Sequence, residues 1–233
     1  MKVIITGSSG GIGRGIATYL AMDGFDVGLL ARSRDSLEDL RQTLEEQGAR
    51  CFSAACDLRD PDQTEFAIAA LIDGLGGVNA LVNNAGIVTR KNVFDLTIDE
   101  WQAMVETNVS GLFYATKSVL SHMKAQRQGH IINISSISGK VPLPGGSGYA
   151  ATKFAVTGFS QSLFHEVREF GIKVTTVYPG SVDSASHRHD PMADSSWKVT
   201  PEQVGQVCRD VLKSDAGTVI SEVEIRPLRK GPG

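Results

Sequence analysis

The sequence predicts a doubly wound α/β fold, in which a mostly parallel seven-stranded sheet carries helices on both faces. Short apolar segments alternate along the chain with longer segments whose apolar residues lie three and four apart, and this alternation is typical of strand–helix–strand units. Several short segments are almost continuously apolar, as at Ile4-Ile5 and Leu81-Val82, which indicates strands that helices cover on both sides. No repeat, low-complexity tract or linker interrupts the 233 residues, so we expect a single domain over residues 1–233.

The expected strands are, in chain order, Val3–Thr6, Val27–Leu30, Arg50–Ala54, Ala80–Asn83, His130–Ser135, Lys173–Tyr178 and Val219–Ile225. The segments between them are expected to be helices, since residues such as Leu37, Leu40 and Leu44 recur at helical spacing. Parallel neighbours need right-handed crossovers, which bring the carboxyl ends of the strands to one edge of the sheet. Ligands bind outside that edge in folds of this class.

Polar and glycine-rich residues follow the predicted strands one after another. They are Gly7 to Gly13 after the first strand, Arg32 after the second, Asp57 after the third, Asn83 to Gly86 after the fourth, Ser136 after the fifth and Pro179-Gly180 after the sixth. Six loops would therefore converge on one edge of the sheet, and we expect the ligand site there.

Composition narrows the functional class. A net charge of -3 gives no basic surface for nucleic acid or anionic lipid, so we expect neither as a partner. No apolar run approaches the ~20 residues of a membrane span, and the first residues lack the pattern of a signal peptide. The three cysteines, Cys51, Cys56 and Cys208, form no C-x-x-C pair, so we expect neither a disulfide framework nor a metal site. These features predict a reduced, cytoplasmic protein.

A glycine-rich turn, Thr6 to Gly13, lies between the first predicted strand and the first predicted helix. Glycines let the backbone turn sharply and approach a pyrophosphate, which the free N–H groups of a helix N-terminus attract. The spacing is neither the common G-x-G-x-x-G pattern nor a P-loop, since no Gly-Lys-Ser/Thr follows. Its position in the first strand–helix turn favours nucleotide binding over a purely structural turn.

The end of the second predicted strand bears on the choice of dinucleotide. An acidic residue there favours NAD, and an arginine accommodates the 2′-phosphate of NADP. The chain has Ala31-Arg32-Ser33-Arg34 and no acid at the strand's end, so Arg32 favours NADP(H). NAD(H) stays possible, since both arginines are also compatible with a solvated loop and Asp35 with a ribose contact.

A phenol and an ammonium stand four residues apart in Tyr149-Ala150-Ala151-Thr152-Lys153, on one face of the segment if it is helical. A cation about 4 Å away favours the phenolate by roughly 4 kcal/mol at an effective dielectric near ~20. We therefore expect Lys153 to lower the pKa of Tyr149 toward the operating pH of a general acid–base catalyst. Such a pair also occurs on ordinary helices, but the serines after the fifth strand add hydroxyls that can bond a substrate oxygen.

In this order the motifs resemble those of the short-chain dehydrogenase/reductase family. Thr6 to Gly13 is similar to its T-G-x-x-x-G-x-G loop, Asn83 to Gly86 to its N-N-A-G motif, and Tyr149 to Lys153 to its Y-x-x-x-K motif. The resemblance extends from Lys2 to about Ser184.

Two further family positions are found by spacing from these motifs. The catalytic serine of the family lies about thirteen residues before the tyrosine, which selects Ser136 over Ser135 and Ser138. The catalytic asparagine lies in the helix after N-N-A-G, where Asn108 stands.

The resemblance implies a Rossmann-type oxidoreductase that interconverts a carbonyl and an alcohol with NADP(H). Tyr149 would be the general acid in reduction, Ser136 would polarise the carbonyl, Lys153 would lower the pKa of the tyrosine and hold the nicotinamide ribose, and Asn108 would hold a water that connects Lys153 to solvent. The implied cofactor contacts are Gly7, Ser9, Gly11, Ile12, Gly13, Arg32, Asp57, Leu58, Asn84, Ala85, Gly86, Tyr149, Lys153, Pro179, Gly180, Val182 and Ser184. Among them Asp57 would lie near the adenine amine, and Ser184 replaces a family threonine.

Substrate choice is expected to depend on a polar flap at about 183–200, with Val141–Ser147 as the opposite wall. Arg188 or a histidine of the flap would either anchor an acidic substrate or, as we favour, face water. Candidate substrates are 3-oxoacyl thioesters, small ketones and aldehydes, and hydroxy acids. The segment Val219–Pro227 lacks the V-D-G-G ending of many family members, so no subfamily is predicted.

Family members commonly form dimers or tetramers through the helices that contain the asparagine and the tyrosine, which implies a homotetramer or homodimer here. Two other functions are compatible with the same fold. An NAD-dependent alcohol dehydrogenase of the same family is disfavoured by Arg32, and a non-catalytic dinucleotide-binding sensor is disfavoured because all four catalytic positions are intact.

Overall fold

The computed structural model describes residues 1–184 and 194–229. Its centre is a seven-stranded sheet in the order β3-β2-β1-β4-β5-β6-β7, and each neighbouring pair of strands is parallel. The strands are β1 (Lys2–Thr6), β2 (Asp26–Ala31), β3 (Cys51–Ala55), β4 (Ala80–Asn83), β5 (Gly129–Ile134), β6 (Ile172–Pro179) and β7 (Glu222–Ile225). The predicted doubly wound fold is confirmed, and the sheet is wholly rather than mostly parallel.

Six of the predicted strands agree with the structure to within one residue at each end. The seventh was predicted from Val219 but begins at Glu222. A turn at Asp215 delays it, because the carboxylate of Asp215 accepts a hydrogen bond from Gly217 N at 2.8 Å and its carbonyl accepts one from Thr218 N at 3.2 Å.

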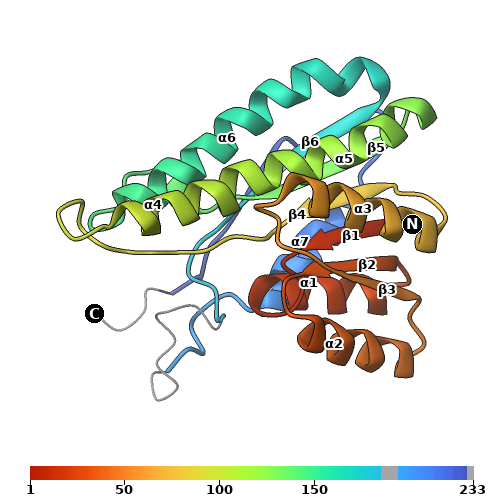
Figure 1. Cartoon of the computed structure of the whole chain (residues 1–233), viewed down its shortest axis with the longest axis horizontal. Helices are drawn as coiled ribbons and strands as arrows, with labels where there is room; N and C mark the ends of the chain where they lie inside the picture. The colour runs from red at the N-terminus through yellow and green to blue at the C-terminus, as the bar shows by residue number, and fades with distance from the viewer. Residues whose placement is uncertain (185–193, 230–233) are drawn as a thin grey trace.

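Helices cover both faces of the sheet, in two layers (Figure 1). On one face lie α1 (Gly11–Met22), α2 (Arg34–Glu46) and α7 (Pro201–Leu212), and on the other lie α3 (Pro61–Leu75), α5 (Gly111–Gln126) and α6 (Ser147–Val167). A shorter helix, α4 (Ile98–Val105), precedes α5. In the described part of the chain, no helix is long and apolar enough to cross a bilayer.

The continuous apolar runs are explained by these two layers. Val3 and Ile5 of β1 pack into the core beneath α1, α2 and α7, whereas Ile4 packs into the core beneath α3 and α5. Successive residues of a strand point to opposite faces, so a strand with a core on each side needs an apolar side chain at every position.

The order of the strands places the expected ligand site between β1 and β4. The chain builds outward from β1 through β2 to β3, then returns to β4 on the other side of β1 and continues to β7. The loops after β1 and β4 therefore diverge from adjacent strands, which is the topological switch point where ligands bind in doubly wound sheets.

Candidate active site

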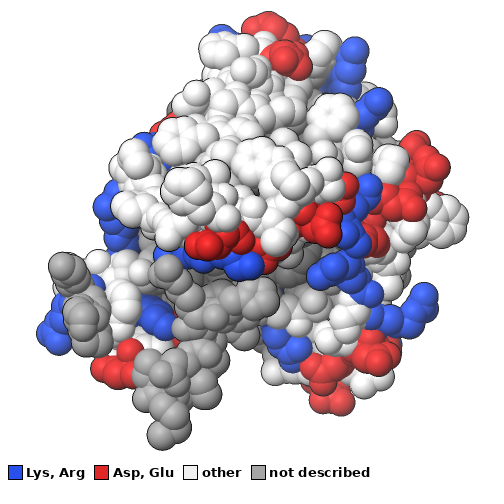
Figure 2. Space-filling view, turned by 60° about the vertical axis from the view of Figure 1, so that its left-hand side comes forward, with Lys and Arg blue, Asp and Glu red and all other residues white. Residues whose placement is uncertain are grey.

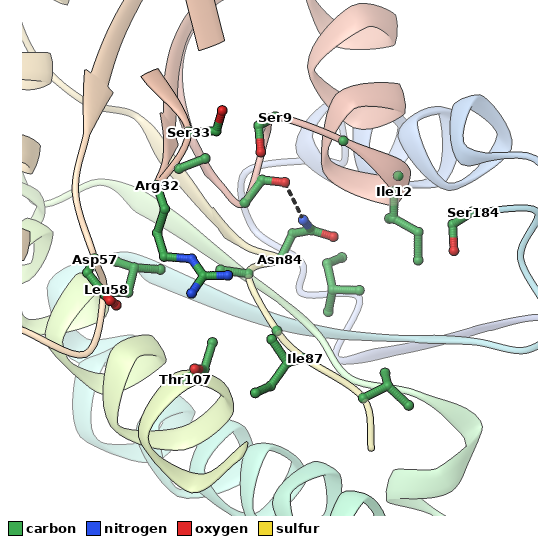
Figure 3. A pocket seen from close by; sticks show the side chains of 18 of the residues that line it. Ser9, Ile12, Arg32, Ser33, Asp57, Leu58, Asn84, Ile87, Thr107 and Ser184 are labelled. Carbon is green, nitrogen blue, oxygen red and sulfur yellow. Dashed lines mark hydrogen bonds between the residues drawn. The ribbon is translucent and has the colours of Figure 1, made fainter. Parts of the chain in front are cut away.

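A cleft of about 660 Å³ lies at the carboxyl edge of the sheet. Figure 3 shows it enclosed by the β1–α1 turn, the ends of β2 and β3, the loop after β4 and the residues that precede α5. Its lining includes many of the predicted cofactor residues, namely Gly7, Ser9, Gly11, Ile12, Arg32, Asp57, Leu58, Asn84, Ala85, Gly86, Tyr149, Lys153 and Ser184. Residues separated by more than a hundred positions in the chain thus meet at one site.

The other predicted residues do not line the cleft. They are Gly13, Asn108, Ser136, Pro179, Gly180 and Val182. Gly180 N donates to Ile225 O at 2.8 Å, which ties the end of β6 to β7, and Val182 pairs with Val199. The cleft is also lined by residues that were not predicted from the sequence, namely Gly10, Ala31, Ser33, Cys56, Ile87, Val88, Thr107, Ile134 and Ser135. Most of these adjoin predicted residues, and the apolar ones have the pattern of ordinary core positions.

The β1–α1 turn is built by close backbone approaches. Gly7 and Gly11 have φ of 66° and 50°, a region that favours glycine. At Gly13 a Cβ would lie 2.1 Å from Gly7 O and 2.4 Å from Asn84 Nδ2. That amide donates to Thr6 O at 3.1 Å and to Gly7 O at 3.2 Å, so the glycine-rich turn and the N-N-A-G loop form one packed unit.

The N-terminus of α1 opens on the cleft. Gly10 is its N-cap, and in the described part of the chain no side chain caps the helix. The first intrahelical bond is donated by Arg14 N to Gly10 O at 3.2 Å. The N–H groups of the first turn are therefore left for an anionic ligand, which the helix dipole also favours.

Charged side chains gather at the ends of β2 and β3. Figure 3 shows Arg32 extending into the cleft between Asp57 and Leu58 on one side and Asn84 on the other. The carboxylate of Asp57 is held by Arg59, whose Nη2 lies 2.6 Å from Oδ2. The hydrogen bonds from Arg59, and to a smaller extent the charge of Arg32, hold the pKa of Asp57 below its ordinary value.

Tyr149 and Lys153 lie on α6 and are both buried. The Ser136 hydroxyl lies near enough to the Tyr149 phenol to lower its pKa. The Ser136 Oγ accepts a bond from Ser138 N at 3.1 Å, which leaves its O–H free to point at the phenol or at a substrate oxygen. Lys153 Nζ donates to Ile134 O at 2.9 Å and lies 5.8 Å from the centre of the Tyr149 ring.

Burial is the main cause of the pKa shifts of Tyr149 and Lys153. It raises the pKa of Tyr149 above the ordinary value, and the nearby Ser136 hydroxyl and the charge of Arg90 offset the rise only in part. Burial also lowers the pKa of Lys153 to about 8. The direction for Tyr149 is opposite to the one expected from the sequence, because loss of hydration penalises a buried phenolate and the Lys153 ammonium is bonded to a carbonyl.

Asn108 lies in a π-turn, Glu106–Ser110, that joins α4 to α5. Such turns occur frequently at functional sites. Its Oδ1 accepts from Ile87 N at 2.8 Å, and its Nδ2 donates to Ile87 O at 2.9 Å and to Thr152 Oγ1 at 3.1 Å. Asn108 therefore fixes the loop after β4 against α6. A Cβ on Gly86 would lie 3.2 Å from Asn108 Oδ1 and 3.8 Å from Lys153 Nζ.

Residues 185–193 lie outside the described part of the chain, and they include Arg188 and the histidines of the predicted substrate flap. After these residues the chain pairs with the segment that follows β6, since Val182 and Val199 form a parallel bridge and Asp183 N donates to Val199 O at 2.8 Å. Among the residues that the structure describes, no three His, Cys, Asp or Glu side chains gather as a metal site.

Comparison with known proteins identifies the family. The family model of short chain dehydrogenases matches residues 1–193, so the chain belongs to the short-chain dehydrogenase family. An uncharacterized oxidoreductase of Staphylococcus aureus (strain MRSA252) is 31% identical over 225 residues, which cover 97% of this chain and 96% of the relative. The resemblance stated from the motifs is thereby confirmed, and the protein is an oxidoreductase of this family.

Solved structures agree with this assignment. An alcohol dehydrogenase from the archaeon Thermococcus sibiricus, complexed with 5-hydroxy-NADP, has a TM-score of 0.92 at 28% identity, with 100% of this chain and 98% of that chain covered. The closed form of a serine dehydrogenase complexed with NADP+ has a TM-score of 0.91 at 30% identity, with the same coverage.

Proposed function

We propose that the protein is an NADP(H)-dependent oxidoreductase that reduces a carbonyl group to an alcohol. The observation that carries this proposal is the buried Tyr149 phenol at the cleft, with the Ser136 hydroxyl near it and Lys153 anchored one helical turn away. A phenol at the cleft and a hydroxyl close to it can both bond the oxygen of a carbonyl substrate.

The cleft suits a nicotinamide dinucleotide, which supplies the hydride when it is bound. The approach of Gly13 to Gly7 O leaves no room for a side chain at the turn, and the uncapped start of α1 faces the same space among the described residues. We assign the pyrophosphate to this turn, a 2′-phosphate to Arg32, the adenine to Asp57 and the nicotinamide end to Lys153 and Ser184. The NADP ligands of the two solved relatives support the same class of cofactor.

Proton transfer is assigned to Tyr149. Burial keeps this phenol protonated at neutral pH because it raises the pKa, so the side chain is ready to donate a proton to a carbonyl oxygen in the reducing direction. Ser136 donates a hydrogen bond to the same oxygen, a contribution of roughly 10²–10³ in rate for a donor of this kind. Lys153, whose pKa is lowered to about 8, returns a proton to the tyrosine side of the cleft.

The substrate is assigned by class only. The two solved relatives are named an alcohol dehydrogenase and a serine dehydrogenase, so small ketones and aldehydes and 3-oxo or hydroxy acids come first in a screen, followed by 3-oxoacyl thioesters.

The test compares wild type with Tyr149→Phe in a carbonyl-reduction screen with NADPH and NADH. Tyr149→Phe is expected to lose turnover. Its binding of NADPH, followed by the fluorescence of the reduced nicotinamide, should be unchanged. Tyr114→Phe, a tyrosine on α5 beyond the cleft lining, serves as the matched control and should retain activity. Turnover by Tyr149→Phe comparable to wild type would refute the mechanism, and tighter binding of NADH would favour an NAD-dependent alcohol dehydrogenase.

We also propose that the protein forms a homodimer or homotetramer through α5 and α6. Phe113 and Phe154 are 44% and 46% exposed there, beside a groove of about 380 Å³ lined by Leu112, Val156 and Phe159 among others. In the upper half of Figure 2 the end of the α4, α5 and α6 layer that includes α4 comes forward, and its surface carries few charged side chains. An apolar patch of this kind is typical of an interface.

Light scattering on Phe113→Glu tests the interface. This variant should shift the protein toward monomer, whereas Phe66→Glu, at a 79% exposed phenylalanine on α3, should keep the wild-type mass. An unchanged mass in Phe113→Glu would place the interface elsewhere.

A further inference from the structure

One carboxylate stands between two arginines at the end of the cleft formed by β2 and β3. Arg32 enters the cleft from the end of β2, and Asp57 lines the same wall (Figure 3). Arg59, two residues after Asp57, was not among the residues predicted from the sequence and does not line the cleft. Its position relative to Asp57 nevertheless bears on what Arg32 can bind.

Arg59 occupies both oxygens of the Asp57 carboxylate. Its Nε lies 3.1 Å from Oδ1 and 3.0 Å from Oδ2, its Nη2 lies 2.6 Å from Oδ2, and its backbone N donates to Oδ1 at 3.0 Å. This two-pronged pairing is the strongest geometry available to an arginine and a carboxylate. The side chains of Asp57 and Arg59 are 29% and 41% exposed, so water screens the pair only in part.

The pairing changes the charge that Arg32 meets. An isolated Asp57 carboxylate beside Arg32 would be an internal partner for its guanidinium and would repel a phosphate dianion. With Arg59 in place the carboxylate is already neutralised, and the group Arg32, Asp57 and Arg59 carries a net positive charge. The charge of Glu106 also acts on Arg59, more weakly than that of Asp57.

We infer that Arg59 is a specificity-determining residue for the dinucleotide, because by neutralising Asp57 it leaves Arg32 free to bind the 2′-phosphate of NADP(H). The inference rests on the proposed NADP(H) dependence of this cleft. Arg59 acts through Asp57 and is therefore a positioning residue, whereas Arg32 is the phosphate ligand. The charge of the loop after β3 thus contributes to a choice that is usually attributed to the end of β2 alone.

The measured quantity is the ratio of the Kd for NADH to the Kd for NADPH, from fluorescence titration of the full chain. The adenine is common to both dinucleotides, so any change in the contact between Asp57 and the adenine cancels in this ratio. Arg59→Gln should lower the ratio about threefold to fivefold, as expected for a partly screened charge pair. Arg59→Lys keeps the positive charge and should retain most of the preference for NADPH over NADH.

A double variant separates the proposed route from a direct contact. In Asp57→Asn the carboxylate that Arg59 neutralises is gone, so adding Arg59→Gln should leave the ratio close to that of Asp57→Asn alone. Arg50→Gln is the control, because Arg50 also pairs with an aspartate, Asp26, at 3.1 Å, and neither residue lines the cleft. It should leave the ratio at the wild-type value.

Each outcome decides the inference. An unchanged ratio in Arg59→Gln, with wild type preferring NADPH, overturns it while the proposed function stands. If Arg59→Gln lowers the Kd ratio as much in the Asp57→Asn background as in wild type, the inference is also overturned, because Arg59 would then contact the phosphate directly. A wild-type protein without preference for NADPH would instead refute the cofactor assignment on which the inference rests.

Discussion

Replacing Gly13 by alanine tests whether the β1–α1 turn and the loop after β4 are one packed unit. The new Cβ would lie 2.1 Å from Gly7 O and 2.4 Å from Asn84 Nδ2, far inside van der Waals contact. Gly7 O belongs to the backbone of a tight turn, and Asn84 Nδ2 cannot move away without losing its bonds to Thr6 O and Gly7 O, at 3.1 and 3.2 Å.

The magnitude follows from these contacts. Two hydrogen bonds of about 1 kcal/mol each would be lost, and overpacking adds about 1–3 kcal/mol. We therefore expect the free energy of unfolding to fall by about 3–5 kcal/mol, a large part of the ~5–15 kcal/mol of a typical domain. NADPH binding should weaken as well, because the turn that would hold the pyrophosphate is displaced.

The same substitution at Gly158 is the matched control. Gly158 lies within α6, is exposed, and a Cβ there would meet no atom within 4 Å. Gly158→Ala should raise stability by up to about 1 kcal/mol, since glycine is a poor helix former. Urea unfolding followed by circular dichroism measures both variants. A Gly13→Ala protein as stable as wild type would show that the turn can open and would refute the packing argument.

Three further predictions concern buried polar groups. The charge of Arg90 lowers the pKa of Tyr149, so Arg90→Gln should shift the pH profile of alcohol oxidation, which needs the deprotonated phenol, toward higher pH; an unshifted profile would contradict this coupling. Burial lowers the pKa of His130 from 6.5 to about 4, so its contribution of up to about 3 kcal/mol is complete above pH 6.5 and lost as the pH falls toward 4. His130→Gln should flatten that dependence in urea titrations, and an equally steep curve would assign acid sensitivity to other groups. Thr152→Val would leave one Asn108 N–H without its 3.1 Å partner and should cost about 1–3 kcal/mol in unfolding free energy, whereas Thr152→Ser should not.

Local pattern was sufficient to predict the fold class, and the resemblance of the motifs to a family named many of the residues that line the cleft. The helical spacing of Leu37, Leu40 and Leu44 and the glycine-rich turn before Gly13 depend on neighbours within one or two turns of chain, and all three leucines are buried on α2 as the pattern requires. The meeting of distant loops was also predictable, because parallel strands bring their carboxyl ends to one edge.

Other features depended on contacts that no local pattern contains. Asn108 finds its partners in Ile87 and Thr152, 21 and 44 residues away. The pairing of Arg59 with Asp57 is local, but alternating charges are common on solvated loops, and only the bond geometry distinguishes this pair from such a loop.

By itself, then, the sequence determined the alternation of strands and helices, the glycine-rich turn and, through the resemblance of its motifs to a family, many of the residues that meet at the cleft. Only the tertiary structure decided the order β3-β2-β1-β4-β5-β6-β7 and the direction in which the pKa of Tyr149 moves. The physical reason is the same for both. Strand order and burial are set by packing among segments far apart in the chain, and the loss of hydration that raises the pKa of this phenol is a sum over atoms from all of them.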